Sequence, residues 1–321
     1  MLSIGYNPKK SMYGPTALIF CIESYRINKL VSITNDHRDL NMNPFTLTIP
    51  GFSIACKSWG HTDSPLILAL HGWLDNANSF DLLAPYLSDK FYLVAVDLPG
   101  HGHSSHLPSG NYYHLIDGIF TTIQIIDALE KEQVHLLGHS LGGCLASLIA
   151  GIAADRILSV AFIDALGPLT SPDVTCHKQL SHFLQDGLCI EDSPSKPYSS
   201  LKLAAQARAK RGYLSLTHAE ILCERGMYEK DGAFFWRHDK RLLAPSPLRM
   251  TEAQVLSCLS AINAKSMLCW ATLGFAFDEE RMQTRIESVK DLTVVELSGG
   301  HHIHMENPEV VGQLLANFFI T

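Results

Sequence analysis

The sharpest chemical signal in the chain is a serine set between two glycines, in the G-x-S-x-G pattern at residues 138–142. An apolar run precedes it, and one helical face follows it at positions 141, 144, 145, 148, 149 and 152. A serine on so tight a strand-to-helix turn has strained backbone dihedrals, so its neighbours two positions away must be small. Gly138 and Gly142 meet that need, and the helix N-terminus favours negative charge beside Ser140. The pattern predicts a nucleophile.

A serine nucleophile needs a base, and the chain offers sixteen histidines. Their densest group, at residues 300–308, reads Gly-His-His-Ile-His-Met-Glu-Asn-Pro and joins the last strand-like run to the last helical pattern. His301, His302 and His304 could together suggest a metal site. No acidic ligand motif accompanies them, so we expect no metal.

The elements that must position these residues alternate along the chain. Apolar runs that fit strands buried on both faces lie at 66–70, 91–96, 134–137, 158–163, 267–271 and 292–297. Two more strand-like runs, 45–49 and 52–59, flank the turn signal Pro50-Gly51. Helical patterns occur at 115–129, at 141–152 and after Pro308. Strands alternating with helices predict an α/β fold with a mostly parallel sheet covered on both sides.

The alternation is interrupted between residues 167 and 264, which are rich in helix formers and lack a buried-strand run. We interpret 167–264 as a helical cap inserted after the sixth strand, and residues 42–166 and 265–321 as the core. Residues 1–41 show no clear periodicity, and the sequence from Met42 reads like a natural start. We therefore expect 1–41 to be a poorly ordered N-terminal extension.

The composition, with 46% hydrophobic and 18% charged residues, is typical of a globular chain with a sizeable core. A net charge of −7 leaves no basic footprint, so nucleic acid is not an expected partner. No run reaches the roughly 18 apolar residues of a membrane span, so stable membrane insertion is not expected either. Eight scattered cysteines without a C-x-x-C pair predict free thiols and a cytoplasmic protein. The oligomeric state cannot be predicted from these features.

Together the motifs resemble the α/β-hydrolase superfamily, and within it the serine hydrolase-like subgroup. The likeness rests on the serine turn, on H-G-W-L-D-N at 71–76, on the D-x-P-G-x-G turn that begins at Asp97, and on S-P-L-R at 246–249. It implies an α/β-hydrolase fold, with a mostly parallel eight-stranded sheet flanked by helices. The family carries a G-H pair in the loop before its closing helix, which implies His301 as the base that activates Ser140.

The family completes its triad with an acid, and this chain offers two. In most members the acid follows the strand at 267–271, where the chain has only the late Asp278, which an N-cap role also explains. Some members, haloalkane dehalogenases among them, keep the acid one strand earlier, where Asp164 ends the run 158–163. We favour Asp164, with Asp278 as the alternative. The acid orients the imidazole and stabilises its cation.

The oxyanion hole of such a site is built from backbone N–H groups. Leu141, directly after the nucleophile, should supply one. The resemblance implies the other from the H-G-x turn, in which Gly72 precedes Trp73, the expected donor. The remaining residues of these turns, His71 and Asp97, are interpreted as loop-shaping.

These residues imply a serine hydrolase that cleaves a small, apolar carboxylic ester through an acyl-enzyme and needs no cofactor. We expect a pocket under the cap lined by Trp73, His139, Phe234 and Trp236. Dehalogenases and epoxide hydrolases of this fold carry Asp where this chain has Ser140. Thioester, lactone and carbon–carbon bond hydrolysis use the same triad and stay open as alternatives. So does a non-catalytic, small-ligand-binding protein on the same fold.

Overall fold

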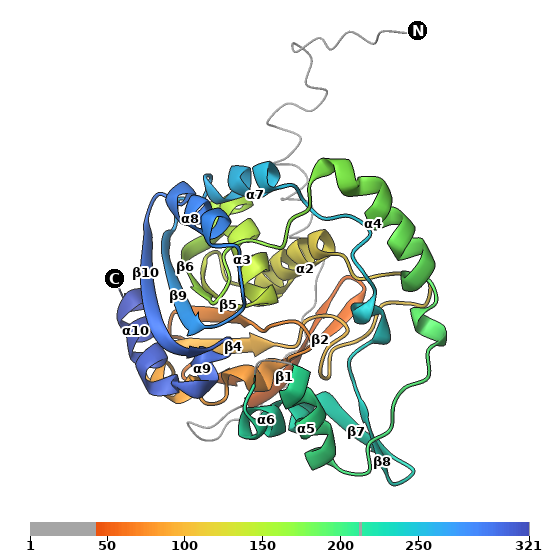
Figure 1. Ribbon diagram of the computed structural model, residues 1–321. Helices are drawn as coiled ribbons and strands as arrows, with labels where there is room; N and C mark the ends of the chain where they lie inside the picture. Colours follow the sequence, from red (N-terminus) through yellow and green to blue (C-terminus); the bar gives the residue numbers. More distant parts are fainter. Residues whose placement is uncertain (1–42, 212–213, 321) are drawn as a thin grey trace, which may run out of the picture. The chain divides into compact units, whose positions relative to one another are not determined.

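The computed structural model describes residues 43–211 and 214–320 (Figure 1). The predicted extension at 1–41 lies outside these residues. One sheet has the strand order β1-β2-β4-β3-β5-β6-β9-β10. Its strands are β1 (Asn43–Ile49), β2 (Phe52–Trp59), β3 (Leu66–Leu70), β4 (Tyr92–Val96), β5 (Val134–His139), β6 (Ile157–Ile163), β9 (Lys265–Leu273) and β10 (Leu292–Gly300). β2 pairs antiparallel with β1 and β4, and all other neighbours are parallel. The predicted fold class is confirmed.

The central strands are buried on both faces because successive side chains enter two different apolar clusters. In β3, Leu66, Leu68 and Leu70 face one cluster, whereas Ile67 and Ala69 face the other. Helices cover the first face: α2 (Leu115–Ala128), α3 (Leu141–Ile152), α7 (Glu252–Leu259) and α8 (Glu279–Ser288). The second face carries α9 (Ile303–Glu306) and α10 (Pro308–Ile320) (Figure 1). None of the helices in the described ranges has the length and apolar character needed to cross a bilayer.

The insertion between β6 and β9 is not wholly helical, which corrects the prediction of a helical cap. It contains α4 (Cys176–His182), α5 (Leu201–Arg211) and α6 (Leu216–Gly226), and also an antiparallel hairpin of β7 (Met227–Lys230) and β8 (Ala233–Trp236). Asp231 and Gly232, both with positive φ, form the hairpin's two-residue turn. Asp-Gly is a strong hairpin signal, but strands of four residues are too short for a convincing periodicity.

The last helix of the insertion packs with the core. Val255 and Leu259 of α7 lie in the same apolar cluster as Leu148 of α3. A separate small cluster holds α5, α6 and the hairpin together; its buried members are Ala204, Ala205, Ala219, Cys223 and Met227. In Figure 1, α4 stands away from this group.

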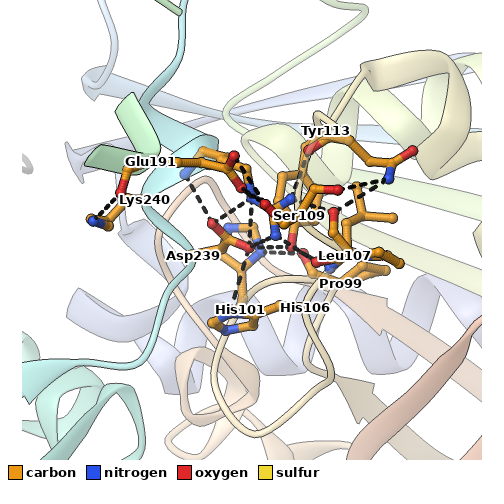
Figure 2. Close-up of polar contacts among 12 residues, drawn as sticks. Pro99, His101, His106, Leu107, Ser109, Tyr113, Glu191, Asp239 and Lys240 are labelled. Atoms are coloured by element: carbon orange, nitrogen blue, oxygen red, sulfur yellow. Dashed lines mark hydrogen bonds and ion pairs between the residues drawn. The ribbon is translucent and has the colours of Figure 1, made fainter. Parts of the chain in front are cut away.

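A buried ionic group ties the insertion to the loop that follows β4 (Figure 2). Arg241 is only 6% exposed on its side chain and forms an ion pair with Asp239 at 2.6 Å. The same guanidinium donates to three backbone carbonyls, those of Leu107, Pro108 and Asn111. A planar fork of five N–H donors suits such a set of acceptors, and no other side chain offers it. The insertion is thereby fixed to the core at this point.

Candidate active site

Ser140 sits on the turn between β5 and α3 in a strained backbone conformation, with φ 51° and ψ −111°. Its glycine neighbours are required by close backbone approach. A Cβ on Gly142 would lie 2.0 Å from the Leu70 carbonyl oxygen, and one on Gly138 would lie 2.3 Å from the Gly142 carbonyl oxygen. Such strain persists only where the surrounding structure imposes it, and it is typical of functional sites. The turn therefore presents the serine as a nucleophile elbow does.

His301 follows β10 and reaches back to the serine. Its Nε2 lies 2.9 Å from Ser140 Oγ, and its Nδ1 lies 2.5 Å from Asp164 Oδ2. Because the carboxylate is an acceptor, Nδ1 carries the proton, and the unprotonated Nε2 accepts from the serine hydroxyl. The imidazole ring is therefore held in the tautomer that can take a proton from Ser140.

Asp164 directly follows the last residue of β6, Ile163, and is fully buried. Its carboxylate also accepts from the backbone N–H groups of Ala271 and Phe275, at 3.1 and 3.0 Å. The structure thus brings Asp164, and not Asp278, to His301. Asp278 caps α8, where its side chain accepts from the N–H of Arg281.

The two expected oxyanion donors come from adjoining turns. Leu141 is the first residue of α3. The turn at residues 71–73 is tied to the elbow because the N–H of Gly142 donates to the carbonyl of His71 at 3.0 Å. The Trp73 side chain is half exposed and donates from Nε1 to the carbonyl of Leu242 in the insertion, at 3.0 Å.

The side chains of His71 and Asp97 form hydrogen bonds to backbone groups of the neighbouring loops. His71 Nε2 accepts from the N–H of Leu98. Asp97 accepts from the N–H groups of Ala77 and His103, and its carboxylate pairs with Arg225 of α6 at 2.9 Å. These bonds hold the loops after β3 and β4 against each other.

A family model described as alpha/beta hydrolase fold matches residues 65–308. The serine hydrolase-like protein of Danio rerio is 30% identical over 284 residues, which are 85% of this chain and 87% of that protein. The chain belongs to the α/β-hydrolase family. Within it, the chain is a member of the serine hydrolase-like subgroup, and human serine hydrolase-like protein 2 is 28% identical over 292 residues, 85% of this chain and 92% of that protein.

Two solved structures add to this. A hypothetical protein of Pseudomonas aeruginosa matches this α/β-hydrolase with a TM-score of 0.83 and 34% identity, over 88% of this chain and all of that one. The thioesterase domain from the curacin biosynthetic pathway matches with a TM-score of 0.74 and 25% identity, over 86% of this chain and 99% of that one.

The expected pocket residues of this α/β-hydrolase make different contacts. His139 has no exposed surface and donates from Nε2 to the backbone carbonyl of His301 at 3.0 Å, so the expectation that it lines a pocket is wrong. It faces inward because side chains along β5 alternate between the two faces of the sheet. Phe234 and Trp236 of β8 pack against the insertion's own apolar cluster.

A small cavity lies close to His301. Its volume is about 160 Å³. The ring of Phe275, which helps to line it, is centred 5.9 Å from the His301 ring. The other lining residues are Leu169, Ala276, Phe277, Asp278, Arg281, Met282 and Arg285. Sequence reasoning did not identify this cavity, because its walls come from the loop after β9, α8 and the start of the insertion.

Behind His301, this α/β-hydrolase buries a second polar group, which we call the Asp75 junction: Asp75, His139, His302 and Arg208. Asp75 Oδ1 accepts from Arg208 Nη2 of α5 at 2.5 Å, and Oδ2 accepts from His302 Nε2 at 3.1 Å. His139 Nδ1 lies 3.5 Å from Oδ2. The sequence contains all four residues, but nothing in their spacing indicates that they meet.

The charges at the junction follow from these contacts. Burial alone would raise the pKa of Asp75, but His302 and the Arg208 guanidinium hold it well below its usual range. Burial lowers the pKa of His139 to about 3, so its imidazole is neutral. The junction is therefore an anionic carboxylate paired with a guanidinium.

A metal ion would find three ligand atoms here. Asp75, His139 and His302 place them within 4.8 Å of one another, and among the described residues they form the one group that does so. The Arg208 guanidinium, however, already balances the carboxylate, and a divalent cation beside it would add uncompensated buried charge. The donor set therefore fits an ion-pair network better than a metal centre.

Proposed function

We propose that this α/β-hydrolase is a serine hydrolase that cleaves a carboxylic ester through an acyl-enzyme on Ser140. The observation that carries the proposal is the hydrogen-bonded chain Ser140–His301–Asp164, with heavy-atom distances of 2.9 and 2.5 Å. A serine hydroxyl is a weak nucleophile until an adjacent base accepts its proton. In this proposal His301 is that base, and Asp164 orients its ring and stabilises the imidazolium.

Acylation follows from this geometry. Ser140 Oγ attacks the ester carbonyl carbon while its proton passes to His301 Nε2. The carbonyl oxygen takes up the negative charge, and the N–H groups of Leu141 and Trp73 would donate to it. As the tetrahedral intermediate collapses, the carbon–oxygen bond to the alcohol breaks, and His301 returns the proton to that leaving oxygen.

Deacylation repeats the steps with water. His301 takes a proton from a water molecule whose oxygen attacks the acyl carbon, and the second tetrahedral intermediate expels Ser140 Oγ. The proton then returns to Ser140, and the carboxylic acid leaves. Every proton is accounted for by His301, so the cycle needs no cofactor.

A small apolar substrate group is supported by the cavity beside Phe275. An engineered cavity of roughly 150 Å³ lined by apolar side chains holds benzene in another protein. The cavity here is of similar size but is partly open to solvent. Leu169, Phe275, Phe277 and Met282 form its apolar wall, and Asp278, Arg281 and Arg285 also line it. We propose that it accepts a short acyl or alcohol group of the ester.

The test is labelling with a fluorophosphonate, in which Ser140 Oγ forms a bond to phosphorus and fluoride leaves. Intact mass should show a single adduct on the wild type and none on Ser140→Ala. A matched control is Ser79→Ala, because Ser79 Oγ also lies 2.8 Å from a histidine, His304 Nε2. That pair is fully buried, and His304 Nδ1 has no hydrogen-bond partner in the described part of the chain.

Ser79→Ala should therefore label as the wild type does. Ester turnover should fall by about 10⁴-fold or more in Ser140→Ala. Folded wild type that forms no adduct and hydrolyses nothing would contradict the proposal and favour the non-catalytic, ligand-binding alternative.

Thioester hydrolysis is a second candidate, which the likeness to the curacin thioesterase domain favours. Acyl transfer from sulfur uses the same nucleophile and base. Matched oxygen and sulfur esters of one acyl chain distinguish the two, since the better substrate has the higher kcat/KM. Lactones belong in the same panel.

We also propose a cytoplasmic location. Seven cysteines lie in the described ranges, and all seven are free thiols. Free thiols persist in a reducing compartment. Fractionation of cells that express a tagged chain tests this.

A further inference from the structure

The Asp75 junction contacts the His301 loop at two points. His139 Nε2 donates to the backbone carbonyl of His301 at 3.0 Å, and His302, the next residue in the chain, donates to Asp75 at 3.1 Å. Both bonds fix the backbone from which the His301 ring projects.

The junction also supports the turn at residues 71–73. A Cβ on Gly72 would lie 2.8 Å from Asp75 Oδ2 and 2.9 Å from His139 Nδ1. The glycine thus packs directly on the carboxylate and on the imidazole. The residue after it, Trp73, is the proposed second oxyanion donor. The Asp75 carboxylate therefore supports both the backbone near His301 and the turn that carries the oxyanion donor.

The insertion reaches the same carboxylate through Arg208 of α5. The Arg208 side chain is 13% exposed and that of Asp75 only 1% exposed, so solvent screens the pair weakly. If Arg208 leaves, Asp75 becomes a buried charge that only two imidazoles face.

We propose that Asp75 is a positioning residue for His301 and that Arg208 makes this positioning depend on the docking of α5. The consequence for catalysis rests on the proposed function, whereas the coupling between the junction and the His301 ring does not. Asp75 acts on the reaction only through the placement and charge environment of His301.

The charged and titratable groups around His301 determine the sign of the test. Asp164 faces its Nδ1, and His139 contacts its backbone. His302 is the next residue in the chain, and His304 lies in α9, which follows. Of the two charges at the junction, Asp75 favours the imidazolium of His301 and Arg208 opposes it. Removing Asp75 and removing Arg208 should therefore shift the titration midpoint of His301 in opposite directions.

A matched control exists in a second pair. Arg225 of α6 and Asp97 have side chains 12% and 0% exposed, and they join the insertion to the core as Arg208 and Asp75 do. The bonds of Asp97 go to Ala55, Ala77, His103, Ser104 and Arg225 and not to the His301 loop. A purely structural effect of breaking a buried pair should appear equally in both.

The experiment is a titration of the full chain carrying ¹³C-labelled histidine, in which His301→Gln identifies the His301 signal. The titration midpoint of His301 should move to lower pH in Asp75→Asn and to higher pH in Arg208→Gln. Arg208→Lys, which keeps the charge, should restore the wild-type midpoint, and Arg225→Gln should leave it in place. Equal midpoints in Asp75→Asn and the wild type, or an equal shift in Arg225→Gln, would overturn the proposal. A substitution that changes the titration midpoint of His302 but not that of His301 would also overturn it.

Fluorophosphonate labelling at pH 7.5 then separates this inference from the proposed function. Misplacement by about 1 Å lowers rates by roughly 100-fold, so Asp75→Asn and Arg208→Gln should label roughly 10- to 100-fold more slowly than Arg225→Gln. Wild type that does not label while its His301 midpoint still responds to Asp75 refutes the proposed function and keeps the coupling. Labelling at one rate in all three variants refutes the positioning role.

Discussion

His301 Nδ1 and Asp164 Oδ2 lie 2.5 Å apart, although they are 137 residues apart in the chain. The loop after β9, where most of the family carries the acid, serves this acid instead. Phe275 of this loop and Ala271 near the end of β9 each donate a backbone N–H to the carboxylate, and a Cβ on Gly274 would lie 2.2 Å from Asp164 Oδ2. The loop therefore packs closely around the Asp164 carboxylate, and a side chain at position 274 would displace that carboxylate.

The two acidic residues should respond differently to substitution. Asp164→Asn removes the charge that stabilises the His301 imidazolium and favours the wrong tautomer, so ester turnover should fall about 10³- to 10⁴-fold. Asp278→Ala removes the N-cap of α8, which costs about 1 kcal/mol of stability. It should lower turnover far less than Asp164→Asn does, because Asp278 lines the cavity while Asp164 is the acid bonded to His301. Steady-state kinetics and urea unfolding of both variants measure this. Strong loss of turnover in Asp278→Ala alone would reverse the assignment.

The ionic group in Figure 2 should matter for stability and not for chemistry. Arg241→Met leaves Asp239 and three carbonyls without their guanidinium, so the free energy of unfolding should fall by about 3–5 kcal/mol. The control is Arg281→Met. Arg281 is 44% exposed and lies 3.6 Å from Glu252, a pair expected to contribute less than about 1 kcal/mol. Urea unfolding midpoints of the two variants measure these losses of stability. Equal losses in Arg241→Met and Arg281→Met would refute the stabilising role of the buried ionic group.

Mild acid should destabilise the fold through buried histidines. Burial lowers the pKa of His101, His139 and His304, in the case of His139 to about 3. In the unfolded chain imidazoles take up protons near pH 6.5. Between these values the unfolded state binds more protons, so the stabilisation is fully present above about pH 6.5 and is lost as the pH falls, by about 1.4 kcal/mol per pH unit for each histidine.

Urea unfolding at pH 7.5, 6.5 and 5.5 measures that slope. His101→Gln keeps an acceptor for the N–H of Leu74, which His101 Nε2 binds at 3.2 Å, but cannot be protonated. The free energy of unfolding of this variant should therefore fall less steeply with decreasing pH than that of the wild type. The difference in slope should equal the contribution of one histidine. A slope identical to wild type would show that His101 does not contribute.

Much of this molecule could be predicted from local patterns. The apolar runs at 66–70 and 158–163 correspond to β3 and β6, because buried parallel strands need continuous apolar residues. The Gly spacing around Ser140 marks the elbow, since close backbone approach excludes a Cβ there. The hairpin β7–β8 was missed because four residues carry too little periodicity.

The sequence alone thus determined the fold class, the elbow and the place of His301 between the last strand and the last helix, because each depends on residues that are neighbours in the chain. Only the tertiary structure decided between Asp164 and Asp278, turned His139 inward, and brought Arg208 to Asp75 across 133 residues. These outcomes depend on how strand ends and the insertion pack together. No local pattern encodes the distance between two side chains that far apart in the chain.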